Sequence, residues 1–181
     1  MTGCFDYYSH YRALASHTIW LHRKRLITND KQRVWFRGNQ SLTQQLIDYS
    51  QGDFQLELLR EYRVKPFMHE ARALGIDLHN ACRIREVLLK CQGEATVFAR
   101  SIISDQAIRA SKHQLTKLGT VPLGHLLFKR ANVNLETRQI AKIERKYNNQ
   151  QRTTFARRTL YQLNGENILV SEFFLQAVWE K

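Results

Sequence analysis

Residues 83–103, RIREVLLKCQGEATVFARSII, decide the fold of this chain. Two apolar runs, 83–91 and 95–103, lie on either side of the short turn Gln92-Gly93. Strand-like runs joined by a short turn that contains glycine are typical of an antiparallel β-hairpin. The sequence therefore predicts a hairpin over these residues.

A second hairpin and one more strand follow from the same reasoning. Asn164-Gly165, the strongest short hairpin turn, separates residues 153–163 from residues 167–175. Residues 54–58 alternate apolar and polar side chains, and the pattern continues toward Val64, as in a half-buried strand. Together the patterns predict five antiparallel strands.

Helix signals precede this sheet in the sequence. Ser41 and Gln44 have the spacing of a capping box, so we expect a helix that begins at Ser41 and runs to about Tyr49. Residues 8–26 mix apolar and basic side chains at helical spacing, which predicts one or two amphipathic helices that cover one side of the sheet.

Three further helices are expected between the two hairpins. Residues 106–118 look helical and end at Gly119 as a C-cap, and Pro122 suits the first position of the next helix. Residues 135–147 predict a polar, basic helix, whereas residues 66–80 are ambiguous. Strands and helices in separate runs indicate an α+β fold, an antiparallel sheet with helices on one side.

The composition fits one globular domain spanning residues 1–181, with 43% hydrophobic residues. The three cysteines cannot pair completely and form no C-x-x-C motif, which favours a reducing cytoplasm. No segment has the roughly 20 apolar residues that cross a bilayer. We therefore expect a cytoplasmic monomer without a membrane span.

The charge is strongly positive, with 28 Lys and Arg against 16 Asp and Glu and a net charge of +12. Such an excess suits nucleic acid, an acidic membrane surface or an anionic small substrate. The basic residues, including Arg157-Arg158, are spread along the chain and are expected mainly on the solvated surface. No recognised nucleic-acid motif occurs, and the seven histidines show no metal-ligand spacing. We expect neither a nucleic-acid partner nor a metal.

Two charged residues interrupt apolar patterns. Arg85 shares a strand face with Val87 and Leu89, and Glu172 shares one with Val170 and Phe174, because side chains alternate along a strand. A buried unpaired ion costs several kcal/mol. Either the two residues form a buried ion pair that fixes strand register, or their faces are less buried than they look, or they bind a small anionic ligand.

The third explanation agrees with nearby helix starts. An arginine presents a planar fork that grips a carboxylate through two hydrogen bonds. The first amides of a helix also attract anions. Leu42 follows the Ser41 cap and Leu123 follows Pro122, so the backbone amide of either residue could face an anion beside Arg85.

The same residues carry a resemblance to a known family. In order, the motifs are Trp35-Phe36 with Ser41-Leu42-Thr43 and Leu46; Ile84-Arg85-Glu86-Val87-Leu88-Leu89 with Gly93-Glu94; Leu118-Gly119 with Pro122-Leu123-Gly124 and Leu127-Phe128; and Leu169, Glu172 and Phe174-Leu175. From about residue 35 to the C-terminus this pattern resembles the chorismate lyases. These bacterial enzymes, also called chorismate pyruvate-lyases, make 4-hydroxybenzoate for ubiquinone.

The resemblance implies a single α+β domain with a six-stranded antiparallel sheet and a ligand site enclosed beneath helical flaps, without metal or organic cofactor. It also implies that Arg85 and the amides of Leu42 and Leu123 hold the product's carboxylate, while Glu172 meets its hydroxyl. Some family members have methionine at the position of Leu42. Residues 135–151 are longer and more basic than the family pattern.

The expected activity is the conversion of chorismate to 4-hydroxybenzoate and pyruvate. In this hypothesis Arg85 anchors the ring carboxylate, and Glu172 orients the 4-hydroxyl and shuttles a proton toward the departing enolpyruvate. Arg100 is a candidate for the second carboxylate of the substrate, with a surface or structural role as its alternative. The alternative function is a non-catalytic sensor domain that binds small aromatic acids.

Overall fold

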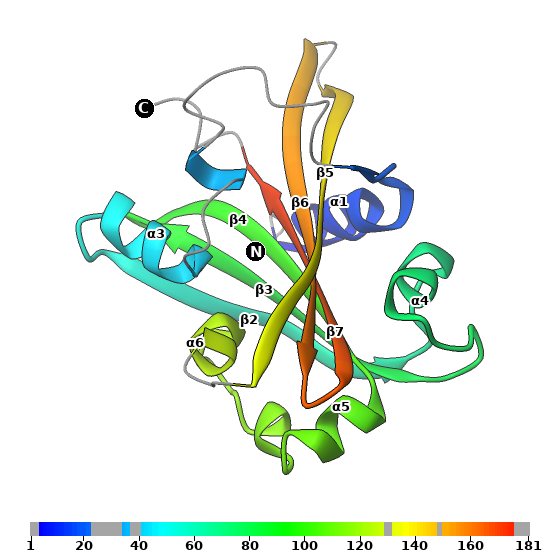
Figure 1. Cartoon of the computed structure of the whole chain (residues 1–181). Coiled ribbons are helices and arrows are strands. Elements are labelled where there is room, and N and C mark those ends of the chain that lie inside the picture. Colours follow the sequence, from blue (N-terminus) through cyan, green and yellow to red (C-terminus); the bar gives the residue numbers. More distant parts are fainter. Residues whose placement is uncertain (1–3, 23–33, 37–40, 129–131, 148–149, 176–181) are drawn as a thin grey trace.

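The computed structural model describes residues 4–22, 34–36, 41–128, 132–147 and 150–175, and these form one antiparallel sheet with helices on it (Figure 1). The strands are β1 (Leu21–His22), β2 (Phe54–Val64), β3 (Cys82–Cys91), β4 (Glu94–Ile103), β5 (Val133–Tyr147), β6 (Gln150–Leu163) and β7 (Glu166–Phe174). The helices are α1 (Cys4–His17), α3 (Leu42–Tyr49), α4 (Met68–Leu74), α5 (Asp105–Ala110), the 3₁₀ turn η1 (Gln114–Thr116) and α6 (Leu123–Phe128). The α+β class is confirmed.

The strand order is β1-β5-β6-β7-β4-β3-β2, with every neighbouring pair antiparallel. Six strands are long, as the resemblance implied, and the two-residue β1 extends the sheet. Both predicted hairpins are present. Their turn residues, Gln92-Gly93 and Asn164-Gly165, all have positive φ, which suits the right-handed twist of the paired strands. Because β4 pairs with β7, the hairpins meet in the middle of the sheet.

The predicted helix over residues 135–147 is wrong, because this segment is strand β5. Its register with β6 runs from Val133 opposite Leu163 to Tyr147 opposite Gln150. Arg138 and Ile140 are buried on one face of the strand. The many polar and basic residues of this segment imitated an exposed helix, whereas pairing with β6 determines the actual conformation.

Three smaller expectations about helices also need correction. The helix expected over 106–118 stops at Ala110, because Lys112 and His113 take positive φ values and only the short η1 follows. The N-terminal helix ends at His17 rather than near residue 26, and residues 23–26 lie outside the described part. Helix α3 has the expected extent, but the Ser41 side chain makes no capping hydrogen bond.

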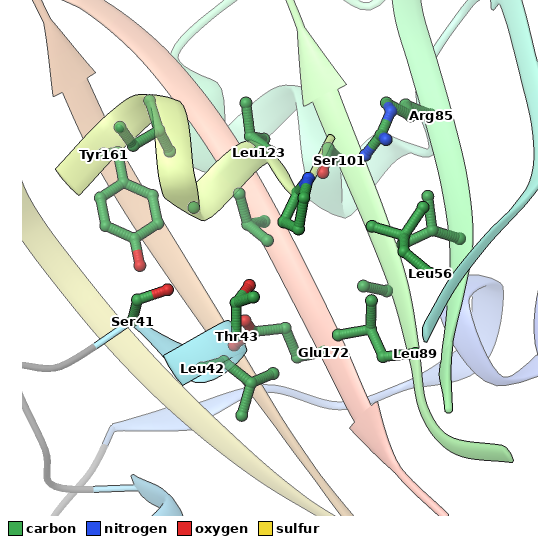
Figure 2. Close-up of a pocket in the computed structure, with 16 residues that line it drawn as sticks. Ser41, Leu42, Thr43, Leu56, Arg85, Leu89, Ser101, Leu123, Tyr161 and Glu172 are labelled. Carbon is green, nitrogen blue, oxygen red and sulfur yellow. The ribbon is translucent and has the colours of Figure 1, made fainter. Parts of the chain in front are cut away.

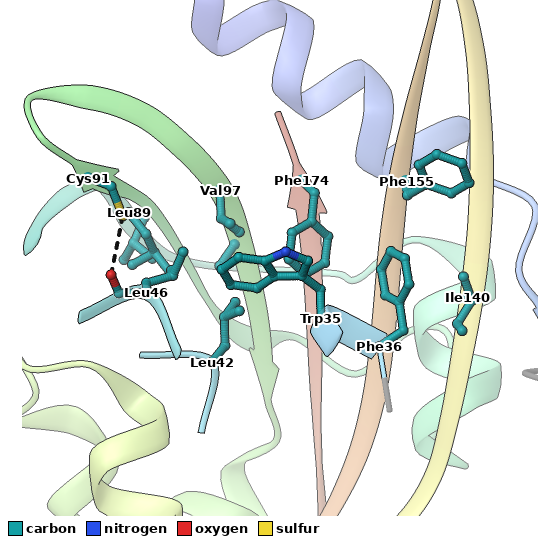
Figure 3. Packing of buried hydrophobic residues seen from close by; sticks show 12 residues of the cluster. Trp35, Phe36, Leu42, Leu46, Leu89, Cys91, Val97, Ile140, Phe155 and Phe174 are labelled. Carbon is teal, nitrogen blue, oxygen red and sulfur yellow. Dashed lines mark hydrogen bonds between the residues drawn. The ribbon is translucent and has the colours of Figure 1, made fainter. Parts of the chain in front are cut away.

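Helices cover both faces of the sheet. One face packs Trp35, Phe36, Leu42 and Leu46 against strand residues that include Phe174 (Figure 3). On the other face, α1 buries residues such as Tyr11 and Leu14 against Phe98 and Phe173. The prediction that the N-terminal helix covers one side of the sheet is confirmed. Helices α3 and α6 lie on the opposite side.

Candidate active site

A cavity lies between the sheet and the N-terminal ends of α3 and α6 (Figure 2). Its lining comes from α3 with its cap (Ser41, Leu42, Thr43), α6 with its flank (Pro122, Leu123, Gly124, Leu127) and the sheet (Leu56, Arg85, Val87, Leu89, Ala99, Ser101, Tyr161, Val170, Glu172). The space between these side chains, including its opening to solvent, is about 500 Å³. A mainly apolar lining with a few convergent polar groups is typical of a small-molecule site.

Strand register brings Arg85 and Glu172 to this cavity. Arg85 on β3 lies opposite Ser101 on β4, and the neighbouring β4 residue of the same face, Ala99, lies opposite Glu172 on β7. Residues that lie opposite each other on neighbouring strands point to the same face of the sheet, and so do residues two apart on one strand. Both charged groups therefore point to the same side. Residues 87 positions apart in the sequence are thereby placed one strand apart, on either side of β4.

Arg85 is 2% exposed, and its printed contacts are with backbone carbonyls. Its Nη2 donates to the carbonyl oxygens of Gly119, at 2.9 Å, and Val121, at 3.1 Å. Its buried Nε has no hydrogen-bond acceptor among the described residues. Burial lowers the pKa of Arg85 and Glu61 opposes that effect. A ligand carboxylate would supply both the missing acceptor and the missing negative charge.

Glu172 forms an ion pair with Arg157, a residue of β6 directly opposite it in the sheet. Arg157 Nε donates to Glu172 Oε2, its Nη2 lies 3.4 Å from Oε1, and its Nη1 donates to the carbonyl oxygen of Trp35 at 2.6 Å. The alternative that Arg85 and Glu172 pair with each other is therefore wrong. Burial opposes the charge of Arg157, but Glu172 raises the pKa of Arg157 above its usual value.

Leu42 and Leu123 are the first residues of α3 and α6, and both line the cavity. The amides of a first helical turn have no acceptor within their own helix. The structure thus brings together Arg85, Glu172, Leu42 and Leu123, which the sequence had proposed as one site.

Arg100 does not join them, because it lies on the opposite face of the sheet and lines no part of this cavity. Its Nε and Nη2 donate to Glu70 at 2.8 and 3.0 Å, and its Nη1 donates to Glu86 and to the hydroxyl of Tyr62. With its charge already matched by two carboxylates, Arg100 is a structural residue. The expectation that it binds the second carboxylate of a substrate is corrected here.

Sequence reasoning missed Arg157, Arg138 and Tyr161. Arg157 and Arg158 were expected on the solvated surface, yet both are buried. The predicted strand over 153–163 held a signal, because period-two alternation puts Arg157 on the same face as Tyr161. Arg138 lies in the segment that was expected to be helical. Its register partner is Thr159, which belongs to that same face.

Two searches of the described residues gave negative results. They contain no cluster of three or more His, Cys, Asp or Glu side chains that could hold a metal ion. Among them, too, no helix is long and apolar enough to span a membrane.

Comparison with known proteins gives a consistent result at the level of sequence. A family model described as chorismate lyase matches residues 14–181. A probable chorismate pyruvate-lyase of Pseudomonas putida is 34% identical over 152 residues, covering 82% of this chain and 84% of the relative. A protein of the same description from Idiomarina loihiensis is 34% identical over 167 residues, covering 87% and 84%.

Solved structures support the fold. The effector domain of PhnF from Mycobacterium smegmatis is similar with a TM-score of 0.58 at 12% identity, covering 78% of this chain and 92% of that domain. A PhnF C-terminal domain gives a TM-score of 0.54 at 16% identity, covering 70% and 86%. These likenesses concern the fold alone. Given the family match over residues 14–181 and the relatives above 30% identity, the chain belongs to the chorismate lyase family of carbon–oxygen lyases.

Proposed function

We propose that this chain converts chorismate to 4-hydroxybenzoate and pyruvate. The observation that carries the proposal is the placement of Arg85 and Glu172 from separate strands in one mainly apolar cavity, without an ion pair between them. A ring with a carboxylate at one end and a hydroxyl at the other matches a cation and an acceptor at separate points of an apolar space. The membership in the family supports the same substrate.

In the proposed complex, the ring carboxylate is held by Arg85 and by the backbone amides of Leu42 and Leu123. The guanidinium keeps its bonds to the carbonyls of Gly119 and Val121, which fix its orientation. Charge and donors fixed in advance of the reaction are the main contribution that a protein can make to such a step. No nucleophile of the protein is needed.

Glu172 is placed to act at the other end of the ring. As pyruvate leaves, the ether bond to the ring breaks, the ring carbon that bears the hydroxyl loses its hydrogen, and the enolpyruvyl fragment gains one. We propose that Glu172 accepts a hydrogen bond from the hydroxyl and passes the proton between these positions. Arg157 supports this role because its ion pair orients the Glu172 carboxylate.

Helices α3 and α6 form the cover of the cavity. Their first turns line it, and their apolar residues Leu42, Leu46 and Leu127 are almost fully buried. A covered site excludes water and strengthens the interactions inside it, but it also slows the departure of product. We therefore propose that release of 4-hydroxybenzoate limits turnover.

The wider setting of the reaction is also a proposal. The product would serve ubiquinone synthesis in the cytoplasm. We propose that the chain acts as a monomer of one domain.

The direct test is to mix the purified chain with chorismate and to follow pyruvate release with lactate dehydrogenase and 4-hydroxybenzoate by chromatography. Equal amounts of both products, lost in Glu172→Gln, are expected. If 4-hydroxybenzoate binds but no pyruvate appears from chorismate, the sensor function replaces the lyase function. The similarity of the fold to the effector domain of PhnF makes that control worth including.

A further inference from the structure

A serine on the sheet side of the cavity has a hydroxyl without a partner. Ser101 of β4 is 4% exposed and lines the cavity. In the part of the chain that the structure describes, its hydroxyl makes no hydrogen bond to another residue. A buried hydroxyl that finds no acceptor costs free energy once water is excluded. We therefore expect a ligand in the cavity to supply the acceptor.

Strand register places Ser101 beside Arg85. The two residues lie directly opposite each other on β4 and β3, and the Cβ atoms of such pairs are typically about 4.5–5.5 Å apart on one face of the sheet. On its other side Ser101 lies opposite Val170 of β7, which also lines the cavity. In the view of Figure 2 the Ser101 hydroxyl lies between the Arg85 guanidinium and Leu123. Ser101 is thus at the cationic end of the cavity.

We propose that Ser101 is a substrate-binding residue whose hydroxyl donates a hydrogen bond to the ring carboxylate. This inference rests on the function proposed above, which puts that carboxylate at Arg85 and gives Ser101 no role. A carboxylate offers about four lone-pair positions to donors. Nη2 of Arg85 already donates to the carbonyl oxygens of Gly119 and Val121. The guanidinium therefore leaves positions on the carboxylate for other donors.

Ser101 differs from the two proposed amide donors in its support. The amides of Leu42 and Leu123 belong to the first turns of α3 and α6, which cover the cavity. Ser101 and Arg85 instead belong to β4 and β3, and each of these strands is paired on both sides. The carboxylate is thus bound from the sheet by Ser101 and Arg85 and from the cover by the amides.

Two hydroxyls of the cover do not carry the same inference. Ser41 and Thr43 also line the cavity, but both residues are only half-buried and lie at the start of α3. A hydroxyl in contact with solvent can bond to water without the cost that applies to a buried one. The buried position of Ser101 on the sheet is what points to a ligand.

The experiment separates the hydrogen bond from the size of the side chain. Isothermal titration calorimetry gives the Kd of 4-hydroxybenzoate for Ser101→Thr and Ser101→Val, which add similar volume and differ by one hydroxyl. Ser101→Val should bind about tenfold more weakly than Ser101→Thr, as expected for one hydrogen bond to a charged group. Equal affinity in the two variants would overturn the proposal, and so would a wild-type chain that does not bind 4-hydroxybenzoate.

Ser101→Ala locates the effect on the carboxylate and decides alone if the larger side chains prevent folding. It should weaken benzoate about tenfold but change the Kd of 4-methylphenol, which has the hydroxyl and no carboxylate, less than about twofold. Ser171→Ala is the matched control, because it removes a similarly buried serine from the opposite face of the sheet, where Ser171 pairs with Arg100. It should bind both ligands as the wild type does. A parallel loss of both ligands in Ser101→Ala would contradict the proposal.

The outcome is independent of the lyase assay. Affinity for 4-hydroxybenzoate that depends on the Ser101 hydroxyl, without pyruvate release from chorismate, would refute the proposed function and retain this binding residue. Pyruvate release by a chain whose affinity does not depend on that hydroxyl would do the reverse.

Discussion

At the scale of single residues, the proposed mechanism assigns binding to Arg85 and proton transfer to Glu172. Arg85 donates to two backbone carbonyls, whereas Glu172 pairs with Arg157. Each charged group is fixed by contacts that the reaction does not have to break. Substitutions at the two positions should therefore have different kinetic signatures.

Glu172→Gln keeps the shape of the side chain but removes its charge and its ability to take a proton. We expect the rate of pyruvate formation in a single turnover to fall by about 10² to 10⁴, the usual contribution of general acid–base catalysis, with a small change in the Kd of 4-hydroxybenzoate. Glu166→Gln, at a partly exposed position of the same strand, is the control and should be unaffected. Normal turnover in Glu172→Gln would contradict the acid–base role.

Arg85→Met should act chiefly on binding. Loss of charge-assisted hydrogen bonds to the ring carboxylate is expected to weaken 4-hydroxybenzoate by about 10- to 100-fold and to raise KM accordingly. Calorimetry with 4-hydroxybenzoate and steady-state kinetics with chorismate measure the two effects. Undiminished affinity for the product would show that the carboxylate lies elsewhere.

Arg157→Met should slow the chemical step without preventing binding. Arg157 bonds to both carboxylate oxygens of Glu172 and to the carbonyl oxygen of Trp35, so its loss removes the contacts that orient the carboxylate. We expect the rate of pyruvate formation in a single turnover to fall by about 10- to 100-fold, with little change in the Kd of 4-hydroxybenzoate. Arg157→Lys, which retains a charge, should restore part of the rate. An unchanged single-turnover rate in Arg157→Met would show that Arg157 has a merely structural role.

Sequence alone indicated Arg85 and Glu172 because each breaks an apolar alternation within a strand that its own hairpin turn identifies. Arg157 and Arg138 were missed, because a basic residue in a basic chain looks like surface and the alternation that places Arg157 beside Tyr161 was not used. Their burial depends on strands that come together only when the hairpins meet and β5 pairs with β6. Arg100 was assigned to substrate binding for the same reason. The sequence indicated its position on a strand but not its ion pairs with Glu70 and Glu86.

At the scale of secondary-structure elements, the sequence correctly predicted those that local signals define. It did not predict those that depend on long-range pairing or packing. Both hairpins rest on turns whose residues must take positive φ, which is a property of the turn itself. β5 and the broken segment after α5 depend on packing against distant strands. Helix α3 shows both kinds of signal. The apolar spacing that predicts it is local, whereas its position over the cavity depends on packing against the sheet.

Leu46→Ala tests that cover. Leu46 is fully buried and packs α3 onto the sheet, so its truncation should cost about 2–5 kcal/mol of stability and loosen the helix over the cavity. Dissociation of 4-hydroxybenzoate, followed by stopped-flow displacement, should become faster. Leu74→Ala, a comparable loss from α4 on the opposite face, should lower the Tm without changing that rate. Equal dissociation rates in both variants would argue against release through α3.

At the scale of the whole molecule, the net charge of +12 suits the anionic substrate of the proposed function. A positive protein attracts a dianion from a distance and raises its encounter rate, and salt screens this attraction beyond about 10 Å at 0.1 M. The buried contacts of the bound ligand are screened much less. We therefore expect kcat/KM for chorismate to fall several-fold between 20 and 500 mM NaCl while kcat stays nearly constant. Sodium sulfate at matched ionic strength separates screening from competition by chloride. A kcat/KM that does not depend on salt would mean that the surface charge serves something other than substrate capture.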